Sequence, residues 1–579
     1  MKIKTKHVLL IAGLAALTFS NTLWNGFVGD DSVLFVDNSF YRSWENFPRL
    51  FESSYSSSSE TVFNRMRKDL GSGSVAYRPV LSTTYFIDSW LWGQKPFGFH
   101  LTNLGIHVLN CILLYIVLLR ILPNASLSLL AALIFAAHPL KSEAVAAIGY
   151  RADLLSTLFV LAAFRLYISA SNGRGLLRWT GVCAFFILGL FSKETAAVFP
   201  FLCLSYDYFV KNESVKTVAR HSGRYAAFFS ILAVYIYLYV FVFTNQAVVF
   251  EYMEGSLFHH VLVMIEIFSG YLINAFIPFT VKSLPPVYHP PLTLYYGLAP
   301  IFSTAVLVGS FLGCALIFRK SRILSFSVLW FLLTFLPVSN IIPVPNPMAY
   351  RFMYLPSVGL SIMLAYLIER ICSLPKLRSE ARAGFMIRNG LVVCMMIYTF
   401  LLNFAWKSNY TMAANMVRDF PYDGQGHLFL GMEYCKTMEI EKAQEELRKA
   451  YEAGVDDPRL LYTMAFCRKS GNKEAERLYK ISIQRYPAYL LSYIGLARIY
   501  LFEKKYDEAL KLLRVVIDGG GNYSAYGYAI QAYMIKGEKD KARGLLEKAK
   551  KTMTEKGHIE SLKRMLASNP GIFPVDIGI

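Results

Sequence analysis

Asp30 and Asp31 stand side by side shortly after the first long apolar stretch of the chain, residues 8–27. A charged side chain at the end of a membrane-spanning segment is costly unless it has a use. An aspartate in this place can act as a general base that takes a proton from an acceptor hydroxyl. The alternative is a helix cap or a solvated loop pair, because adjacent side chains in a loop need not face the same point.

Cationic and polar side chains gather at the ends of other apolar stretches. An arginine binds phosphate oxygens in a bidentate way, which a lysine cannot do. Several cations on one side of a membrane would neutralise the charge that develops on the phosphate of a lipid carrier. Each residue taken alone can equally be an interface anchor or a snorkelling side chain. The candidates are His138, Lys141 and Glu143 in HPLKSEAV, Arg151 and Asp153 in GYRAD, Lys193 and Glu194 in FSKET, and Arg351.

The composition is that of a membrane protein. Hydrophobic residues make up 55% of the 579 residues and charged residues 17%, whereas a soluble domain carries about 25% charged residues. The net charge of +19 makes nucleic-acid binding an alternative, but no nucleic-acid-binding motif is present. We therefore attribute the positive charge to cytoplasmic loops and anionic lipid, and we expect no nucleic-acid partner.

Apolar stretches of about the 20-residue length that a bilayer requires recur along the chain. The first follows Lys2, Lys4 and Lys6 and resembles a signal peptide. Because no small-residue cleavage site follows it, we interpret it as a retained span with cytoplasmic lysines. About eleven spans are expected, at residues 8–27, 100–119, 127–137, 147–166, 177–190, 196–209, 225–243, 299–318, 324–338, 353–371 and 391–406.

The topology follows from basic groups that should be cytoplasmic, at residues 211–224, 319–322 and 376–388. An even number of crossings must separate the first two groups, and two are already assigned. The remaining apolar stretch, residues 261–279, is therefore expected to be re-entrant or interfacial. The same parity predicts an external location for the two aspartates, His138, Lys193, the loop 340–351 and everything after residue 406.

Residues 27–99 form a long first external loop. It contains GDDSVLFVDN, a Ser-rich stretch at residues 53–59 and AYRP at residues 76–79. Residues 81–92 are aromatic and partly amphipathic, which predicts a helix lying along the membrane interface. The Ser-rich stretch is either a mobile flap or a linker, and we favour the linker.

From about residue 425 the chain becomes charged and helical, with repeats spaced by roughly 34 residues, the tetratricopeptide period. The clearest units lie at residues 493–512 and 525–546, and fainter ones at 431–450 and 462–486. About four helix–turn–helix units are enough for a stable solenoid with a concave binding face. The eight cysteines form no CxxC pair, so we expect buried thiols rather than a metal site or a disulfide framework.

Seven motifs follow one another along the chain before the repeats. In their order and spacing the chain resembles the tetratricopeptide-containing transmembrane O-mannosyltransferases of the GT-C glycosyltransferase superfamily, over nearly its whole length. One departure is Tyr350, because the family commonly has an acidic residue before the arginine of the last motif, where it would form an ion pair. The motifs are DDSVLFVDN (30–38), YRPVLSTTYFID (77–88), GFHLTNLGIHVLN (98–110), HPLKSEAV (138–145), GYRADLLS (149–156), SKET (192–195) and AYRFMYLPS (349–357).

The resemblance implies an all-α fold, with a polytopic GT-C-type membrane domain at residues 1–410 and a repeat domain at residues 425–570. It implies inverting transfer of a sugar, mannose by family default, from a polyprenyl- or dolichyl-phosphate donor to a protein hydroxyl on the external face. Asp30 matches the catalytic acidic position, and Asp31 would support it. Basic positions suited to the donor phosphate are Arg78, Arg151, Lys193 and Arg351. His138, Glu143, Glu194 and Tyr77 are expected to organise the site.

No cofactor is required, because a lipid phosphate is already a good leaving group. Asp30 and Asp31 could ligate a divalent cation, but no His/Asp cage accompanies them. The expected partners are the lipid-phosphate sugar, a protein or peptide acceptor on the concave face of the repeats, and membrane lipid.

Two alternatives stay open for the function. One is transfer to a lipid-linked or envelope glycan, and the other is a non-catalytic membrane scaffold that presents the repeats. We expect a multi-pass membrane protein with periplasmic or lumenal repeats, and we favour a bacterial inner membrane over the endoplasmic reticulum because the repeats are few.

Overall fold

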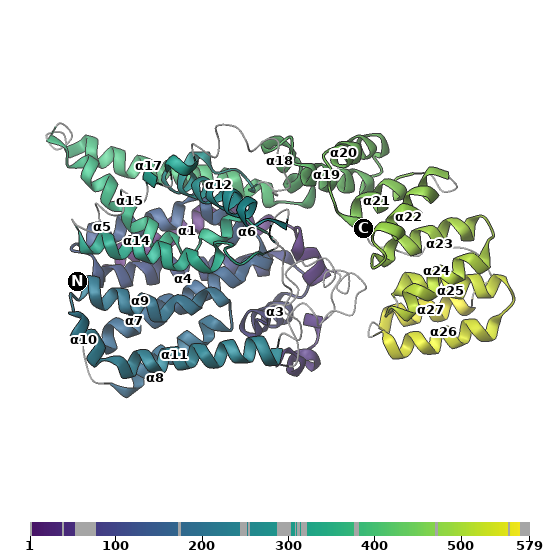
Figure 1. The fold of residues 1–579 in the computed structure, drawn as a ribbon, viewed down its shortest axis with the longest axis horizontal. Coiled ribbons are helices and arrows are strands. Elements are labelled where there is room, and N and C mark those ends of the chain that lie inside the picture. Colours follow the sequence, from purple (N-terminus) through teal and green to yellow (C-terminus); the bar gives the residue numbers. More distant parts are fainter. Residues whose placement is uncertain are drawn as a thin grey trace. The chain divides into compact units, whose positions relative to one another are not determined.

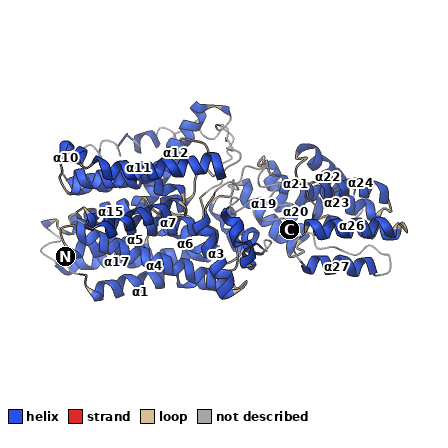
Figure 2. Cartoon of the chain, turned by 90° about the horizontal axis from the view of Figure 1, so that it is seen from below, coloured by secondary structure: helices blue, strands red, loops and turns tan. Residues whose placement is uncertain are grey.

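The computed structural model describes residues 3–36, 40–51, 77–171, 175–243, 252, 255–285, 303–306, 308–309, 313, 321–344, 346–375, 381–468, 473–520, 522–553 and 556–567. Every regular element within these ranges is a helix, and Figure 2 shows no strand among them. The predicted all-α class is confirmed. The described residues divide into two compact units, which we call the membrane unit, ending at Met412, and the repeat unit, which starts at Ala413 and also includes Phe40.

The membrane unit is built from apolar helices whose lengths and composition suit a bilayer. Helices α1, α4 and α5 pack against one another, and α7 packs against α4 and α8 (Figure 1). The helices of this unit are α1 (Thr5–Phe19), α3 (Pro79–Trp92), α4 (Pro96–Ile121), α5 (Ala125–Ala137), α6 (Ser142–Ala146), α7 (Arg151–Ala170), α8 (Leu176–Leu190), α9 (Phe199–Ser205), α10 (Val215–Arg220), α11 (Ser222–Tyr237), α12 (Leu257–Phe276), α14 (Arg322–Phe335), α15 (Ser357–Cys372), α17 (Ala381–Leu402) and the start of α18 (Asn409–Asp419).

Six helical segments in the described part of the chain are long and apolar enough to cross a membrane, which makes this a multi-pass integral membrane protein. They are Thr5–Trp24, Pro96–Ile121, Ile148–Ala170, Ser222–Val242, Leu257–Phe276 and Arg382–Trp406. The pair Ala125–Ala137 and Pro139–Ala146, bent by 54°, forms a seventh if it is one span.

The predicted count of about eleven spans differs from this set. The predicted spans at 177–190, 196–209, 324–338 and 353–371 fall on helices α8, α9, α14 and α15, each shorter than 18 residues. Most of the predicted span 299–318 lies outside the described residues. The ambiguous stretch 261–279 falls on α12, one unbroken helix of 20 residues. That length suits a full crossing as well as an interfacial position, and it differs from a re-entrant pair of short helices.

Close helix packing depends on a glycine at one position. A Cβ added to Gly359 in α15 would lie 2.3 Å from the Ser327 carbonyl oxygen and 2.9 Å from the Phe331 amide nitrogen of α14. Both of these are backbone atoms, which cannot yield as the end of a side chain can. Glycine therefore lets α14 and α15 approach closely, as small residues do in membrane helix pairs.

The repeat unit consists of antiparallel helix pairs that stack in sequence order. The pairs are α19 (Gly424–Lys436) with α20 (Ile440–Glu452), α21 (Pro458–Phe466) with α22 (Lys473–Arg485), α23 (Leu490–Phe502) with α24 (Tyr506–Asp518), and α25 (Tyr523–Ile535) with α26 (Lys539–Thr552). A final helix, α27 (Lys556–Ala567), packs on α25 and α26. Residues such as Leu447, Ile494 and Tyr528 are buried between the helices, so each pair covers the apolar face of its neighbour.

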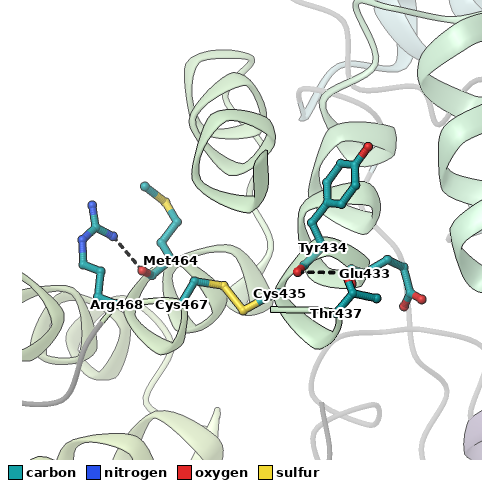
Figure 3. The surroundings of a disulfide bond; sticks show 7 residues. All are labelled: Glu433, Tyr434, Cys435, Thr437, Met464, Cys467 and Arg468. Atoms are coloured by element: carbon teal, nitrogen blue, oxygen red, sulfur yellow. Dashed lines mark hydrogen bonds between the residues drawn. A yellow bond between two sulfur atoms is a disulfide. The ribbon is translucent and has the colours of Figure 1, made fainter. Parts of the chain in front are cut away.

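The expectation that the cysteines form no disulfide is wrong for one pair. Cys435 at the end of α19 and Cys467 just after α21 form a disulfide, with Cα atoms 5.9 Å apart (Figure 3). The two cysteines are 32 residues apart in sequence. They come together because the first helices of successive repeats are neighbours, which cysteine spacing by itself does not reveal.

Candidate functional site

The two adjacent aspartates lie in different environments. Asp31 is 1% exposed, and its carboxylate accepts backbone N–H groups from Gly149 (2.6 Å), Ile148 (3.2 Å) and Val28 (3.4 Å). Burial raises the pKa of Asp31 to about 7, which the three N–H donors lower in part and the neighbouring Asp30 raises further. Asp30 is only half-buried. Asp31 therefore ties the first loop to the turn Ile148–Tyr150 that precedes α7, and Asp30 is the more exposed carboxylate of the pair.

The turn Ile148–Tyr150 lies next to both Asp30 and Arg351. The Arg351 guanidinium carbon lies 4.0 Å from the centre of the Tyr150 ring, a cation–π contact. Asp30 lies beside the preceding residue of the same turn, because a Cβ added to Gly149 would lie 3.8 Å from the Asp30 Cβ. An aspartate from the first loop and a guanidinium from the 3-10 turn Tyr350–Met353 thus lie beside neighbouring residues of the turn Ile148–Tyr150.

Arg351 is held by Glu143 of α6. The Arg351 backbone N–H donates to Glu143 Oε2 at 3.0 Å, and the guanidinium forms an ion pair with Oε1. The Arg351 side chain is 13% exposed and that of Glu143 is 3% exposed. Tyr350 therefore does not leave the arginine of the last motif without an acidic partner, because the carboxylate comes from a different helix.

His138 joins the bent helix pair to the end of α12. The Leu140 N–H donates to His138 Nδ1 at 3.3 Å, so Nε2 carries the proton that it shares with the Ala275 carbonyl at 3.1 Å. This arrangement fixes the turn that leads to Glu143. Glu143 then contacts Arg351 directly, whereas the hydrogen-bond partners of His138 are backbone groups of Leu140 and Ala275.

Lys193 and Arg78 extend the row of charged groups beyond Arg351. The Lys193 ammonium and the Arg351 guanidinium both lie over the ring of Phe352, at 5.4 and 5.0 Å. Lys193 forms an ion pair with Asp153 at 2.7 Å. Burial lowers the pKa of the Lys193 ammonium; Asp153 partly offsets this effect, and the nearby Arg78 adds to it. The row of groups is therefore continuous from Arg351 to Arg78.

Arg78 precedes α3 and pairs with Glu194. Its guanidinium lies 2.8 Å from Glu194 Oε1, and the two side chains are 18% and 42% exposed. The Val80 N–H donates to the Phe191 carbonyl at 3.3 Å, which holds the start of α3 beside the turn that carries Glu194. Tyr77 is buried and packs edge-on against Phe191. Arg78 is thus a partly exposed cation on a fixed backbone.

The structure places Arg151 differently from the other predicted phosphate ligands. Its guanidinium is fully buried, forms an ion pair with Asp88 at 2.6 Å, and donates to Asn103, Thr84 and the Phe99 carbonyl. Three of its five N–H groups donate in these bonds, so Arg151 joins α7 to α3 and α4. Its complete burial and its pairing with Asp88 distinguish it from the partly exposed Arg78 and Arg351.

Two aromatic residues in this region, Tyr150 and Phe352, were not among the predicted site residues. Each directly neighbours a predicted arginine in sequence, Arg151 and Arg351 respectively. That adjacency is the one signal that could have drawn attention to them. In the described part of the chain no group of three or more His, Cys, Asp or Glu side chains could hold a metal ion, and the Asp31 oxygens are engaged by backbone amides.

Taken together, a half-buried carboxylate stands at one end of a row of cations, on turns that connect membrane helices. A base and an anion-binding row in this order suit the transfer of a group from a phosphate ester to a hydroxyl. The fold and the site define an all-α, multi-pass membrane protein with a C-terminal helical-repeat solenoid.

Comparison with curated proteins supports the resemblance drawn from the motifs. The chain is 24% identical to human protein O-mannosyl-transferase TMTC3 over 93% of its own length and 62% of that protein. It is 22% identical to the Caenorhabditis elegans protein O-mannosyl-transferase F38B6.6 over 74% of this chain and 59% of the relative. Human protein O-mannosyl-transferase TMTC1 is 31% identical over 34% of this chain and 23% of the relative.

The chain thus spans about three-fifths of the length of the relatives that it matches most fully. No family model matches it.

Proposed function

We propose that this protein is a membrane glycosyltransferase that moves a sugar from a lipid-linked phosphate donor to a hydroxyl of a protein. The observation that carries the proposal is the placement of Asp30 beside Gly149 and of Arg351 over the ring of the next residue, Tyr150. A base and a phosphate-binding cation next to each other are what the two ends of the reaction require. The printed names of the relatives, protein O-mannosyl-transferases, support mannose as the sugar and protein as the acceptor.

The reaction proceeds by displacement at the anomeric carbon of the sugar. Asp30 takes the proton of the acceptor hydroxyl as the oxygen forms its bond to that carbon. The bond from the anomeric carbon to the phosphate oxygen breaks, and the phosphate leaves with the electron pair. Arg351, with Lys193 and Arg78 beyond it, stabilises the negative charge on the leaving group.

The exposure of the three cationic side chains indicates which of them can contact the donor phosphate. Lys193 is 6% exposed and bound to Asp153, whereas Arg351 and Arg78 are 13% and 18% exposed. The two arginines are therefore the direct phosphate ligands in this proposal. Lys193 adds positive potential from the Phe352 ring that it shares with Arg351. Arg151 has a structural role in this proposal.

We further propose that the repeat unit lies in the periplasm or lumen and docks the acceptor protein. The disulfide between Cys435 and Cys467 supports this location, because such bonds persist in oxidising compartments. Acceptor segments would then reach Asp30 from the aqueous side.

The test uses membranes that contain the full-length protein and labelled polyprenyl-phosphate mannose, followed by separation of protein from lipid products. We expect label in the protein fraction, and its loss in Asp30→Asn with membrane insertion unchanged. Glu45→Gln, an exposed carboxylate of the same loop, is the matched control and should retain activity.

Label in lipid products alone would favour a glycan acceptor. Full activity of Asp30→Asn would remove this residue from the mechanism. Normal binding of a partner by the repeats, with no transfer by the wild type, would favour a scaffold.

A further inference from the structure

The loop that carries Asp30 is anchored to the chain that follows the last membrane helix. The Gly29 N–H donates to Asn409 Oδ1 at 2.7 Å, and the Gly26 N–H donates to the Lys407 carbonyl at 3.0 Å. Gly29 has φ +59°, a left-handed conformation that favours glycine. This turn directs its N–H toward Asn409, immediately before the proposed base.

The Asn409 side chain is not required to start its own helix. The Thr411 N–H donates to Ser408 Oγ at 3.1 Å, and the Ser408 N–H donates to Thr411 Oγ1 at 2.9 Å. These reciprocal bonds cap the first turn of α18. The Asn409 amide oxygen is therefore available for the loop, and its bond to Gly29 joins segments that are far apart in sequence.

Asp30 is thus held from both sides by its neighbours. Gly29 is fixed by Asn409, and Asp31 is fixed by the backbone amides at the start of α7. The backbone on both sides of Asp30 is therefore fixed, which limits where its carboxylate can lie. A general base needs its oxygen within hydrogen-bond reach of the acceptor proton, so an error of about 1 Å can cost about a hundredfold in rate.

We propose that Asn409 is a positioning residue that sets the location of Asp30 for proton transfer. This inference rests on the proposed function of Asp30. Helix α18 starts in the membrane unit at Asn409, and its residues from Ala413 onward belong to the repeat unit. In the repeat unit the same helix packs tightly against α19, where a Cβ at Gly426 would lie 3.1 Å from the Met416 Cβ.

The test compares Asn409→Ala with Ser408→Ala in full-length protein reconstituted in lipid vesicles, with labelled polyprenyl-phosphate mannose as the varied donor. We expect Asn409→Ala to lower kcat by about 10- to 100-fold, with the KM for the donor unchanged because the phosphate-binding arginines are untouched. Ser408→Ala removes the helix cap and should lower the thermal stability while leaving kcat unchanged. Asn409→Asp keeps an acceptor oxygen for the Gly29 N–H and should restore most of kcat.

Asp30→Asn, measured in parallel, separates the two proposals. If it is inactive while Asn409→Ala keeps the kcat of the wild type, the positioning role is overturned and the proposed function stands. A fall in kcat in Asn409→Ala no larger than that in Ser408→Ala also overturns the positioning role. If Asp30→Asn retains transfer, the proposed function itself fails.

Discussion

The pairing of Glu143 with Arg351 gives the sharpest prediction, because it joins two nearly buried charges from distant parts of the chain. The Glu143 side chain is 3% exposed, and it accepts both the backbone N–H and the guanidinium of Arg351. Arg351→Ala removes the guanidinium and leaves the carboxylate buried without its counter-charge. Glu143→Ala leaves the guanidinium over the Tyr150 ring, where it retains a cation–π contact.

The two single substitutions should therefore have unequal costs. Breaking a buried ion pair by removing one partner costs about 3–5 kcal/mol, and we expect Arg351→Ala to reach this range. Glu143→Ala should cost less, since Arg351 is 13% exposed and keeps its aromatic partner. The double variant leaves neither charge unpaired, so its loss should fall short of the sum by about 1–3 kcal/mol.

The assay is thermal unfolding of the purified protein in detergent, with both single variants, the double variant and the wild type measured together. With an unfolding entropy of about 2.1 cal/mol/K per residue, a unit of roughly 400 residues shifts its Tm by about 1 °C per kcal/mol, so Arg351→Ala should unfold about 4–6 °C below the wild type. Arg382→Ala, an exposed arginine of α17, is the control and should leave the Tm within error. Additive losses in the double variant would refute the pairing that the site depends on.

Two further predictions concern other parts of the chain. Because burial raises the pKa of Asp31 to about 7 in the folded state, the folded protein binds a proton between about pH 4 and pH 7 that the unfolded chain has released. Stability should therefore fall as the pH rises through this window and stay level above it, and Asp31→Asn should flatten the profile of Tm against pH. Reduction of the Cys435–Cys467 disulfide, or replacement of both cysteines by serine, should lower the Tm of the repeat unit, because closing a loop of 32 residues contributes about 3–4 kcal/mol. Cys394→Ser removes an exposed free thiol and is the control. Equal Tm values with and without the disulfide would contradict the prediction.

Several features of the fold were predictable because they depend on local sequence patterns. Apolar stretches near 20 residues predicted the membrane helices, and the spacing near 34 residues predicted the stacked helix pairs of the repeat unit. The number of spans was less predictable. Short helices such as α8 and α14 were counted as crossings on hydropathy alone, although length and packing also decide whether a helix spans.

The residue types of the candidate site were predictable from the sequence, but the residues with which each of them pairs were not. Arg151 and Arg351 carry the same side chain, yet one is buried against Asp88 and the other lies partly exposed over Tyr150. Sequence position does not distinguish them, because the carboxylate that each arginine meets comes from another helix. The same holds for the disulfide, whose two cysteines become neighbours only when successive repeats stack.

Residue order alone thus determined the class of this protein, a membrane helix bundle followed by a repeat solenoid, because hydropathy and period are local properties. Tertiary structure decided which of two adjacent aspartates is buried against backbone amides and which is only half-buried. The reason is physical: the environment of a carboxylate is set by the amides, charges and rings that packing brings to it, here from more than a hundred residues away.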